Sequence, residues 1–477
     1  MTEATMKTSV PYFFAVKGQW TIRQNVENKS ILSPFHLIET PWRQFVLLFL
    51  EVMRFCYLPV LAVGNLLEFV LNVMLANGGI INTLLKVTFP CTGKLVVRCR
   101  DDENFATLLS IMDRRWSLKA QTPENRTGSR DIADILVMAS KLAYENAAYN
   151  RRVVSTIWKM NFVGFYDCWN EYFKVAGTQV LLFTDKSENA NAIVVAFRGT
   201  EPFNMLDWST DVDFSWFELE DAGRVHVGFW EALGLGDREK IMQLSSGTNA
   251  APLKEKHSVE SREDSDDQEK LKAYSYLTSK VKTLMYENPE AKLYVTGHSL
   301  GGALAALYTT ALFYYNETMV TERLGALYTF GQPRVGDRKL SKYMESKIDE
   351  AKYVRVVYTN DMVPRLPFDD SAFKFKHACM CYYVNSFYHG KTMEDAPFPN
   401  FFSIRFFFRF ITMRLTALQE LILSTFLWLF VGRDYKETIE STLFRAMGLI
   451  VPGISDHGLT NYINIVRLGR LHSDSKY

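Results

Sequence analysis

Apolar runs alternate with helically periodic stretches between about residues 190 and 360. The run at 192–197 is continuous and rich in β-branched residues, which is typical of a strand buried on both faces of a parallel sheet. Further strands are predicted at 293–296, 326–330 and 353–358, and helices at 274–286 and 340–349. This alternation predicts an α/β fold with a mainly parallel sheet and right-handed crossovers.

The same pattern predicts three elements outside that region. Residues 95–98 indicate the start of a strand, and residues 130–150 place apolar side chains at helical spacing. Residues 459–466 indicate a late helix, which follows a loop rich in proline and glycine.

Two stretches have a different, polar character. Residues 1–40 are mixed and contain turn signals, so little regular structure is expected there. Residues 244–270 contain almost no apolar side chains, which indicates a disordered surface insertion. A solvated spacer is favoured there over a regulatory phosphorylation site. We therefore divide the chain into an N-terminal region, 1–90, and one catalytic domain, 91–477.

The N-terminal region becomes very apolar from Phe45 onward. Its uncharged windows, 55–67 and 69–85, are shorter than the roughly 20 residues that a membrane span requires. We expect a helical hairpin that enters one leaflet of a lipid surface; the alternative is a pair of buried helices covering the catalytic domain. A second apolar zone, 401–431, fits a membrane interface and a pair of core helices equally well.

The composition limits the classes of function that this chain can have. The 477 residues are 48% hydrophobic and 14% aromatic. This content is enough for a large core and leaves aromatic side chains available for contact with a lipid surface. The net charge of +1 gives no indication of nucleic-acid binding. Six scattered cysteines imply neither a zinc site nor a disulfide framework, and favour a reducing, intracellular setting. The N-terminus lacks the pattern of a secretory signal.

One stretch combines a strand, a tight turn and a helix around a serine. Ser299 lies between Gly297 and Gly301, in the Gly-x-Ser-x-Gly pattern of a nucleophile elbow. Glycines at both positions let the strand and helix approach closely, so the hydroxyl can stand clear of the backbone. The alternative is a glycine-rich turn with an idle, buried serine.

A serine nucleophile needs a histidine base and an acid that orients it, which follow in the order Ser, Asp, His in such folds. Asp361, in a proline-stiffened loop after a predicted strand, is the favoured acid, with Asp337 as the runner-up. His457, in a late Pro/Gly-rich loop, is favoured as the base over His377.

The oxyanion of an acyl-transfer reaction needs two or more N–H or O–H donors. One donor is the backbone N–H of Leu300, directly after the serine. The other is expected from a loop after an earlier strand, where Thr200 also offers a hydroxyl. No metal or cofactor is expected.

Six ordered motifs resemble the class 3, fungal-lipase-like triacylglycerol lipases. They are Phe197-Arg-Gly-Thr200, Asp207-Trp-Ser-Thr-Asp-Val212, Val225-His-Val-Gly-Phe229, Gly297-His-Ser-Leu-Gly-Gly302, Tyr328-Thr-Phe-Gly-Gln-Pro-Arg-Val-Gly336 and Asn360-Asp-Met-Val-Pro-Arg-Leu-Pro367. The long N-terminal region and the late motif Pro452-Gly-Ile-Ser-Asp-His457 are similar to the plant oil-body lipases in particular.

This resemblance implies an α/β-hydrolase fold with Ser299, Asp361 and His457 as the triad and Thr200 in the oxyanion hole. It also implies that residues 201–212 form a lid, in which Phe203 and Trp208 can turn from the active site into lipid. The implied substrate is long-chain triacylglycerol on the cytosolic side of a lipid droplet. Diacylglycerol, phospholipid and galactolipid substrates remain open, as does a non-catalytic droplet scaffold.

Overall fold

The computed structural model describes residues 59–119, 129–170, 175–200, 216–236, 271–367, 369, 374–399, 404–451 and 453–471. The expected lid with Phe203 and Trp208, the polar insertion and residues 1–58 lie outside this described part.

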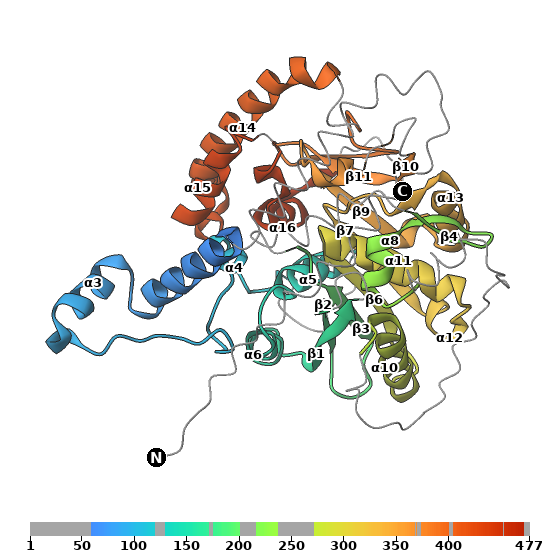
Figure 1. The fold of residues 1–477 in the computed structure, drawn as a ribbon, viewed down its shortest axis with the longest axis horizontal. Coiled ribbons are helices and arrows are strands. Elements are labelled where there is room, and N and C mark those ends of the chain that lie inside the picture. The colour runs from blue at the N-terminus through green and yellow to red at the C-terminus, as the bar shows by residue number, and fades with distance from the viewer. Residues whose placement is uncertain are drawn as a thin grey trace.

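A nine-stranded sheet forms the centre of the molecule (Figure 1). Its strands, in spatial order, are β1 (Asn161–Asn170), β2 (Val175–Thr184), β3 (Ala192–Phe197), β6 (Lys292–His298), β7 (Leu324–Phe330), β9 (Tyr353–Tyr358), β11 (Cys381–Val384), β12 (His389–Met393) and β13 (Arg470–Leu471). The run from β3 through β11 is parallel. Strands β1 and β2 extend it in antiparallel fashion. The mainly parallel sheet expected from the sequence is confirmed.

A second, antiparallel sheet is smaller. Its order is β10 (Phe375–Lys376), β8 (Gly336–Asp337), β5 (Gly223–His226) and β4 (Trp216–Leu219).

Helices cover both faces of the large sheet. One layer contains α10 (Ala273–Glu287) and α11 (Leu300–Tyr314), and the other contains α5 (Ser129–Leu142) and α16 (Leu459–Leu468). Strand β3 shows why two layers are needed: Ile193 and Val195 belong to the first core cluster, whereas Val194 belongs to the second. Successive side chains of a strand point to opposite faces, so a wholly apolar strand must be covered twice.

The remaining helices are short or peripheral. They are the helix Pro59–Ala76, α3 (Ile80–Thr88), α4 (Leu108–Met112), α6 (Ala147–Arg152), α8 (Val227–Ala232), α12 (Thr318–Thr321), α13 (Arg338–Lys347), α14 (Ile404–Val431) and α15 (Ile439–Met447). Single helical turns occur at Pro90–Thr92, Val153–Ile157, Glu350–Lys352, Val363–Arg365, Arg433–Tyr435 and Ser455–His457.

Two local expectations were wrong. Residues 95–98 are not a strand, because the backbone N–H and C=O of Val96 bond to the side chain of Asn77 (3.0 and 2.8 Å) and not to a sheet. The helix expected over 130–150 is two helices, because Asn146 caps a new one by accepting a hydrogen bond from the N–H of Tyr149 (2.8 Å).

Two apolar helices stand out by length and composition. The helices Pro59–Ala76 and Ile411–Val431 are both long and apolar enough to cross a membrane. The first, with α3, extends away from the sheet, and α14 lies along the edge of the domain near α15 (Figure 1). Their large apolar side chains are exposed in many positions. The alternative of two N-terminal helices buried against the catalytic domain is therefore wrong for the described residues.

Candidate active site

Ser299 occupies a strained turn between β6 and α11. Its backbone has φ 60° and ψ −133°, a conformation that residues with a Cβ rarely adopt. A Cβ on Gly297 would lie 2.1 Å from the carbonyl oxygen of Gly301, and one on Gly301 would lie 2.2 Å from that of Phe197. Both glycines are thus required by the close approach of helix and strand, as the sequence pattern predicted.

The strain at Ser299 leads to a stability prediction. Ser299→Gly should relieve strain of about 1–3 kcal/mol and lose about 0.5–1 kcal/mol through the more flexible unfolded chain. The expected net gain is about 1 kcal/mol in the free energy of unfolding, measured by urea denaturation. Ser299→Ala is the matched control, since alanine keeps the Cβ and should show no gain. A destabilised glycine variant would mean that the turn is not strained.

Asp361 and His457 are brought together from positions 96 residues apart. The Nδ1 of His457 lies 2.8 and 3.0 Å from the two carboxylate oxygens of Asp361. Asp361 follows β9 and is fully buried, whereas His457 ends the helical turn Ser455–His457. The Nε2 of His457 is buried and has no hydrogen-bond partner among the described residues. An imidazole held at Nδ1 in this way keeps Nε2 available to accept a proton.

Two further groups hold the carboxylate of Asp361. The backbone N–H of Val363 donates to Oδ1 (2.9 Å), and the hydroxyl of Tyr462 donates to Oδ2. Burial and the charge of Asp361 raise the pKa of Tyr462 well above its ordinary value, so the phenol stays protonated as a donor. Sequence reasoning did not find this role, because Tyr462 lies on α16 and meets Asp361 only in the fold.

Tyr462 is therefore expected to act as a positioning residue. Tyr462→Phe removes one hydrogen bond to a charged group, which is worth about 1.5–3 kcal/mol, and should lower kcat about tenfold with little change in KM. Tyr353→Phe is the matched control, since this buried hydroxyl donates to Gln332 (2.7 Å) and not to Asp361. If both variants lost kcat equally, the loss in Tyr462→Phe would reflect general destabilisation and not a positioning role of Tyr462.

The alternative acid and base have other structural roles. Asp337 caps α13 by accepting from the N–H of Leu340 (2.9 Å). The Nε2 of His377 bonds to the carbonyl oxygen of Pro364 (2.7 Å). Burial, and then the charge of Arg355, lower the pKa of His377 well below its ordinary value.

His298 connects the elbow to the loop of His457. Its Nε2 lies 2.9 Å from the carbonyl oxygen of His457, and its Nδ1 lies 3.0 Å from the hydroxyl of Tyr144. The rings of His298 and His457 are 4.5 Å apart between centroids. Burial and the neighbouring His457 lower the pKa of His298 well below its ordinary value, so it remains neutral. The expectation that His298 braces the turn is consistent with these contacts.

Gly331 places the serine next to the Asp361–His457 pair. The carbonyl oxygen of Phe330 accepts from the N–H of Ser299 (2.9 Å). A Cβ on the next residue, Gly331, would lie 2.9 Å from Cε1 of His457 and 3.0 Å from Oδ2 of Asp361. Phe330, which is hydrogen-bonded to Ser299, is thus followed directly by Gly331, which lies against both His457 and Asp361. Gly331 also has φ 61°, so glycine suits this position on two counts.

The predicted oxyanion loop also lies against the elbow. A Cβ on Gly199 would lie 2.3 Å from the carbonyl oxygen of His298, the residue before Ser299. The hydroxyl of Thr200 is buried without a hydrogen-bond partner among the described residues. Leu300 is the first residue of α11, so its N–H has no partner within the helix. Donors left unpaired beside a serine are those that an oxyanion would use.

Comparisons with known proteins find similarity to lipases. Residues 194–371 match the class 3 lipase family. A triacylglycerol lipase of Arabidopsis thaliana, OBL1, is 40% identical over 437 residues, covering 88% of this chain and 83% of the relative. The OBL1 lipase of Nicotiana tabacum is 41% identical over 86% of this chain and 80% of its own. The solved Rhizomucor miehei triacylglyceride lipase is 24% identical, covers 54% of this chain and 82% of that one, and superimposes with a TM-score of 0.37.

Proposed function

This chain belongs to the class 3 lipase family, and we propose that it hydrolyses long-chain triacylglycerol through a triad of Ser299, Asp361 and His457. The observation that carries the proposal is the hydrogen bond between His457 and Asp361 beside the strained turn of Ser299. The relatives at about 40% identity are triacylglycerol lipases, and they supply the substrate class.

In the first half of the reaction, Oγ of Ser299 attacks the ester carbonyl carbon while Nε2 of His457 takes the hydroxyl proton. The negative charge that develops on the carbonyl oxygen is held by the N–H of Leu300 and by Thr200. The intermediate then collapses, the ester C–O bond breaks, and His457 returns the proton to the departing glycerol oxygen. The product is an acyl-serine and a diacylglycerol.

In the second half, water attacks the acyl-serine and His457 takes the proton of the water. The bond to Oγ of Ser299 breaks, the serine recovers its proton, and the fatty acid leaves. Asp361 holds the imidazole in the tautomer with a proton on Nδ1 and stabilises the imidazolium that forms in each half. Tyr462 and Val363 keep the carboxylate in place.

We place the reaction at a lipid-droplet surface on its cytosolic side. Triacylglycerol is insoluble, so the enzyme must work at the boundary of a lipid phase. The apolar helix Pro59–Ala76 and α3 support residues 1–90 as a lipid-associating region attached to the lipase domain 91–477. In the same proposal, residues 201–212 with Phe203 and Trp208 act as the lid.

The test uses the full-length protein and needs no mutation. A fluorophosphonate ester reacts only with an activated serine, which displaces fluoride and forms an Oγ–P bond. We expect stoichiometric labelling of the peptide that contains Ser299, with equal loss of fatty-acid release from emulsified trioleoylglycerol. Labelling elsewhere would overturn the assignment of the nucleophile. Preferential release from phospholipid or galactolipid would overturn the substrate.

A further inference from the structure

The most exposed side chains of helix α15 are all apolar. Ile439, Leu443 and Met447 are 77%, 64% and 50% exposed, and every other residue of the helix is at least partly covered. Their spacing of four residues puts them on one face. Ile450 and Val451 continue this face beyond the end of the helix. A helix facing water normally exposes polar or charged residues instead.

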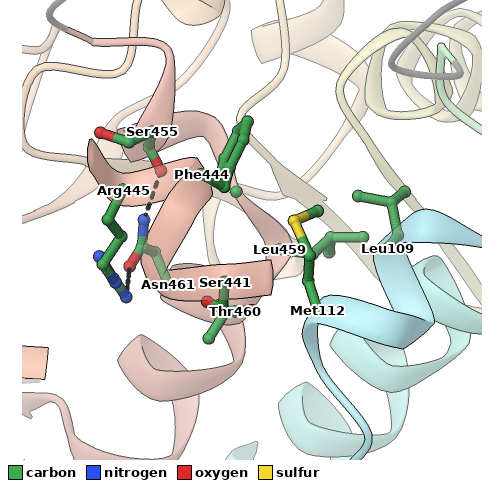
Figure 2. A pocket seen from close by; sticks show the side chains of 10 residues that line it. Leu109, Met112, Ser441, Phe444, Arg445, Ser455, Leu459, Thr460 and Asn461 are labelled. Atoms are coloured by element: carbon green, nitrogen blue, oxygen red, sulfur yellow. Dashed lines mark hydrogen bonds between the residues drawn. The ribbon is translucent and has the colours of Figure 1, made fainter. Parts of the chain in front are cut away.

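The inner face of α15 holds the loop of the proposed catalytic base (Figure 2). The guanidinium of Arg445 donates to the side-chain oxygen of Asn461 (2.8 Å). The amide of Asn461 in turn donates to the carbonyl oxygen of Ser455 (2.9 Å), two residues before His457. Phe444 lines a small pocket in the same place. The helix with the apolar outer face therefore supports the position of His457.

Helix α14 continues the apolar face and packs beside α15 (Figure 1). From Ile411 to Val431 its buried positions recur on one side: Met413, Ala417, Glu420, Ser424 and Leu427. Most of its exposed apolar positions recur on the other: Ile411, Leu415, Leu418, Ile422, Phe426 and Leu429, while Phe430 and Val431 are also exposed at its C-terminal end. Arg414 is the only exposed charged residue of this stretch. Because one whole side packs on the domain, α14 lies along a surface and does not stand in lipid on all sides.

Charge does not explain what this face binds. The polar cleft at the junction of α14 and α15 is lined by four basic residues, Arg114, Arg115, Arg433 and Lys436, and by four acidic ones, Asp113, Asp434, Glu437 and Glu440. Equal numbers of the two signs provide no net attraction for an anionic headgroup. Protein interfaces usually combine an apolar centre with polar and charged groups, whereas the exposed residues of α15 and of α14 from Ile411 to Val431 are apolar except for Thr412, Arg414 and Thr425. An uncharged, apolar phase matches these faces better than a protein does.

We propose that α15, together with the outer face of α14, docks on the surface of a neutral lipid phase and brings the His457 loop to that surface. This inference rests on the proposed function, since an ester-rich lipid phase would then be both substrate and docking partner. The chain would then contact lipid in two places: through its N-terminal helices and through this face in its C-terminal part. Because Arg414 is the only exposed charged residue on α15 and on α14 from Ile411 to Val431, salt should have little effect on the docking.

The double variant Ile439→Asp/Leu443→Asp tests the inference, with Tyr286→Asp as the matched control. Tyr286 is 83% exposed on α10, away from α15 (Figure 1). Three quantities are measured on the full-length chain: hydrolysis of soluble p-nitrophenyl butyrate, flotation with trioleoylglycerol emulsion coated with phosphatidylcholine, and fatty-acid release from that emulsion. The Tm and the oligomeric state are measured in parallel.

We expect the double variant to keep its Tm and its butyrate activity within about twofold but to bind the emulsion at least about tenfold more weakly, since it lacks two exposed aliphatic side chains that docking would bury in lipid. The control should match the wild type. Wild-type binding should change less than about twofold between 0.05 and 0.5 M NaCl.

Unchanged emulsion binding by the double variant would overturn the docking role of α15. A lower Tm would show instead that another part of the chain covers this face, and a loss of dimers would identify it as an interface between copies. Both results contradict the proposal. If the wild type hydrolyses neither substrate, the proposed function fails whatever the binding result. Emulsion binding tests the docking and hydrolysis tests the function, so the two failures can be told apart.

Discussion

Ser299→Ala is expected to reduce kcat on both soluble butyrate ester and emulsified triacylglycerol by about 10⁴-fold or more. Removing the nucleophile of a serine hydrolase leaves only the contributions of the oxyanion donors and of substrate binding. The fold should survive, because alanine keeps the Cβ and the backbone bond to Phe330. Initial rates with purified full-length protein, with Tm as the check on folding, measure the effect.

Ser424→Ala is the matched control for this variant. Ser424 is also buried, but its hydroxyl donates to the carbonyl oxygen of Leu421 (3.1 Å) within α14. It should lose less than about twofold in kcat. If Ser299→Ala kept wild-type activity, Ser299 would not be the nucleophile. If the wild type itself were inactive, a non-catalytic droplet scaffold would be favoured.

His457→Ala should cause a loss similar to that of Ser299→Ala, whereas His377→Ala should lose less than about tenfold. Of these two histidines, His457 is the one bonded to Asp361, and its Nε2 has no hydrogen-bond partner among the described residues. His377 bonds to the carbonyl oxygen of Pro364 and contributes to packing. Steady-state kinetics on the soluble ester compare the two variants without interference from lipid binding.

The combination of His457→Ala with Ser299→Ala provides the internal control. Two residues that act as one unit lose little more together than either does alone. A double variant much weaker than both single variants would show that the residues act independently. A large loss in His377→Ala at unchanged Tm would exchange the roles of the two histidines.

The central strands and the elbow were predictable because their signals are local. A run such as 192–197 has no polar face, so it must be buried on both sides wherever the chain goes. Gly297, Ser299 and Gly301 needed only five consecutive residues to indicate the turn. The order of Ser299, Asp361 and His457 along the chain then limited the choice of acid and base.

Other elements depended on partners that the local sequence does not reveal. Residues 95–98 have a suitable composition for a strand, but the side chain of Asn77 takes the hydrogen bonds of Val96. Residues 404–410 and 421–431, from the two apolar zones, are parts of one helix of 28 residues. The separation of residues 411–431 into exposed and buried sides depends on what α14 packs against, and sequence alone left an interface and a core helix equally open.

The sequence by itself determined which residue types were available, their order, and the short segments that bury themselves without help. The tertiary structure decided which distant groups meet. Tyr462 reaches Asp361 across 101 residues, and His298 reaches the carbonyl oxygen of His457 across 159. Such contacts arise because parallel strands carry their following loops to one edge of the sheet, where spacing along the chain no longer measures distance. The same packing left apolar side chains exposed on the outer faces of α14 and α15. Periodicity alone could not distinguish these exposed positions from positions in a buried core.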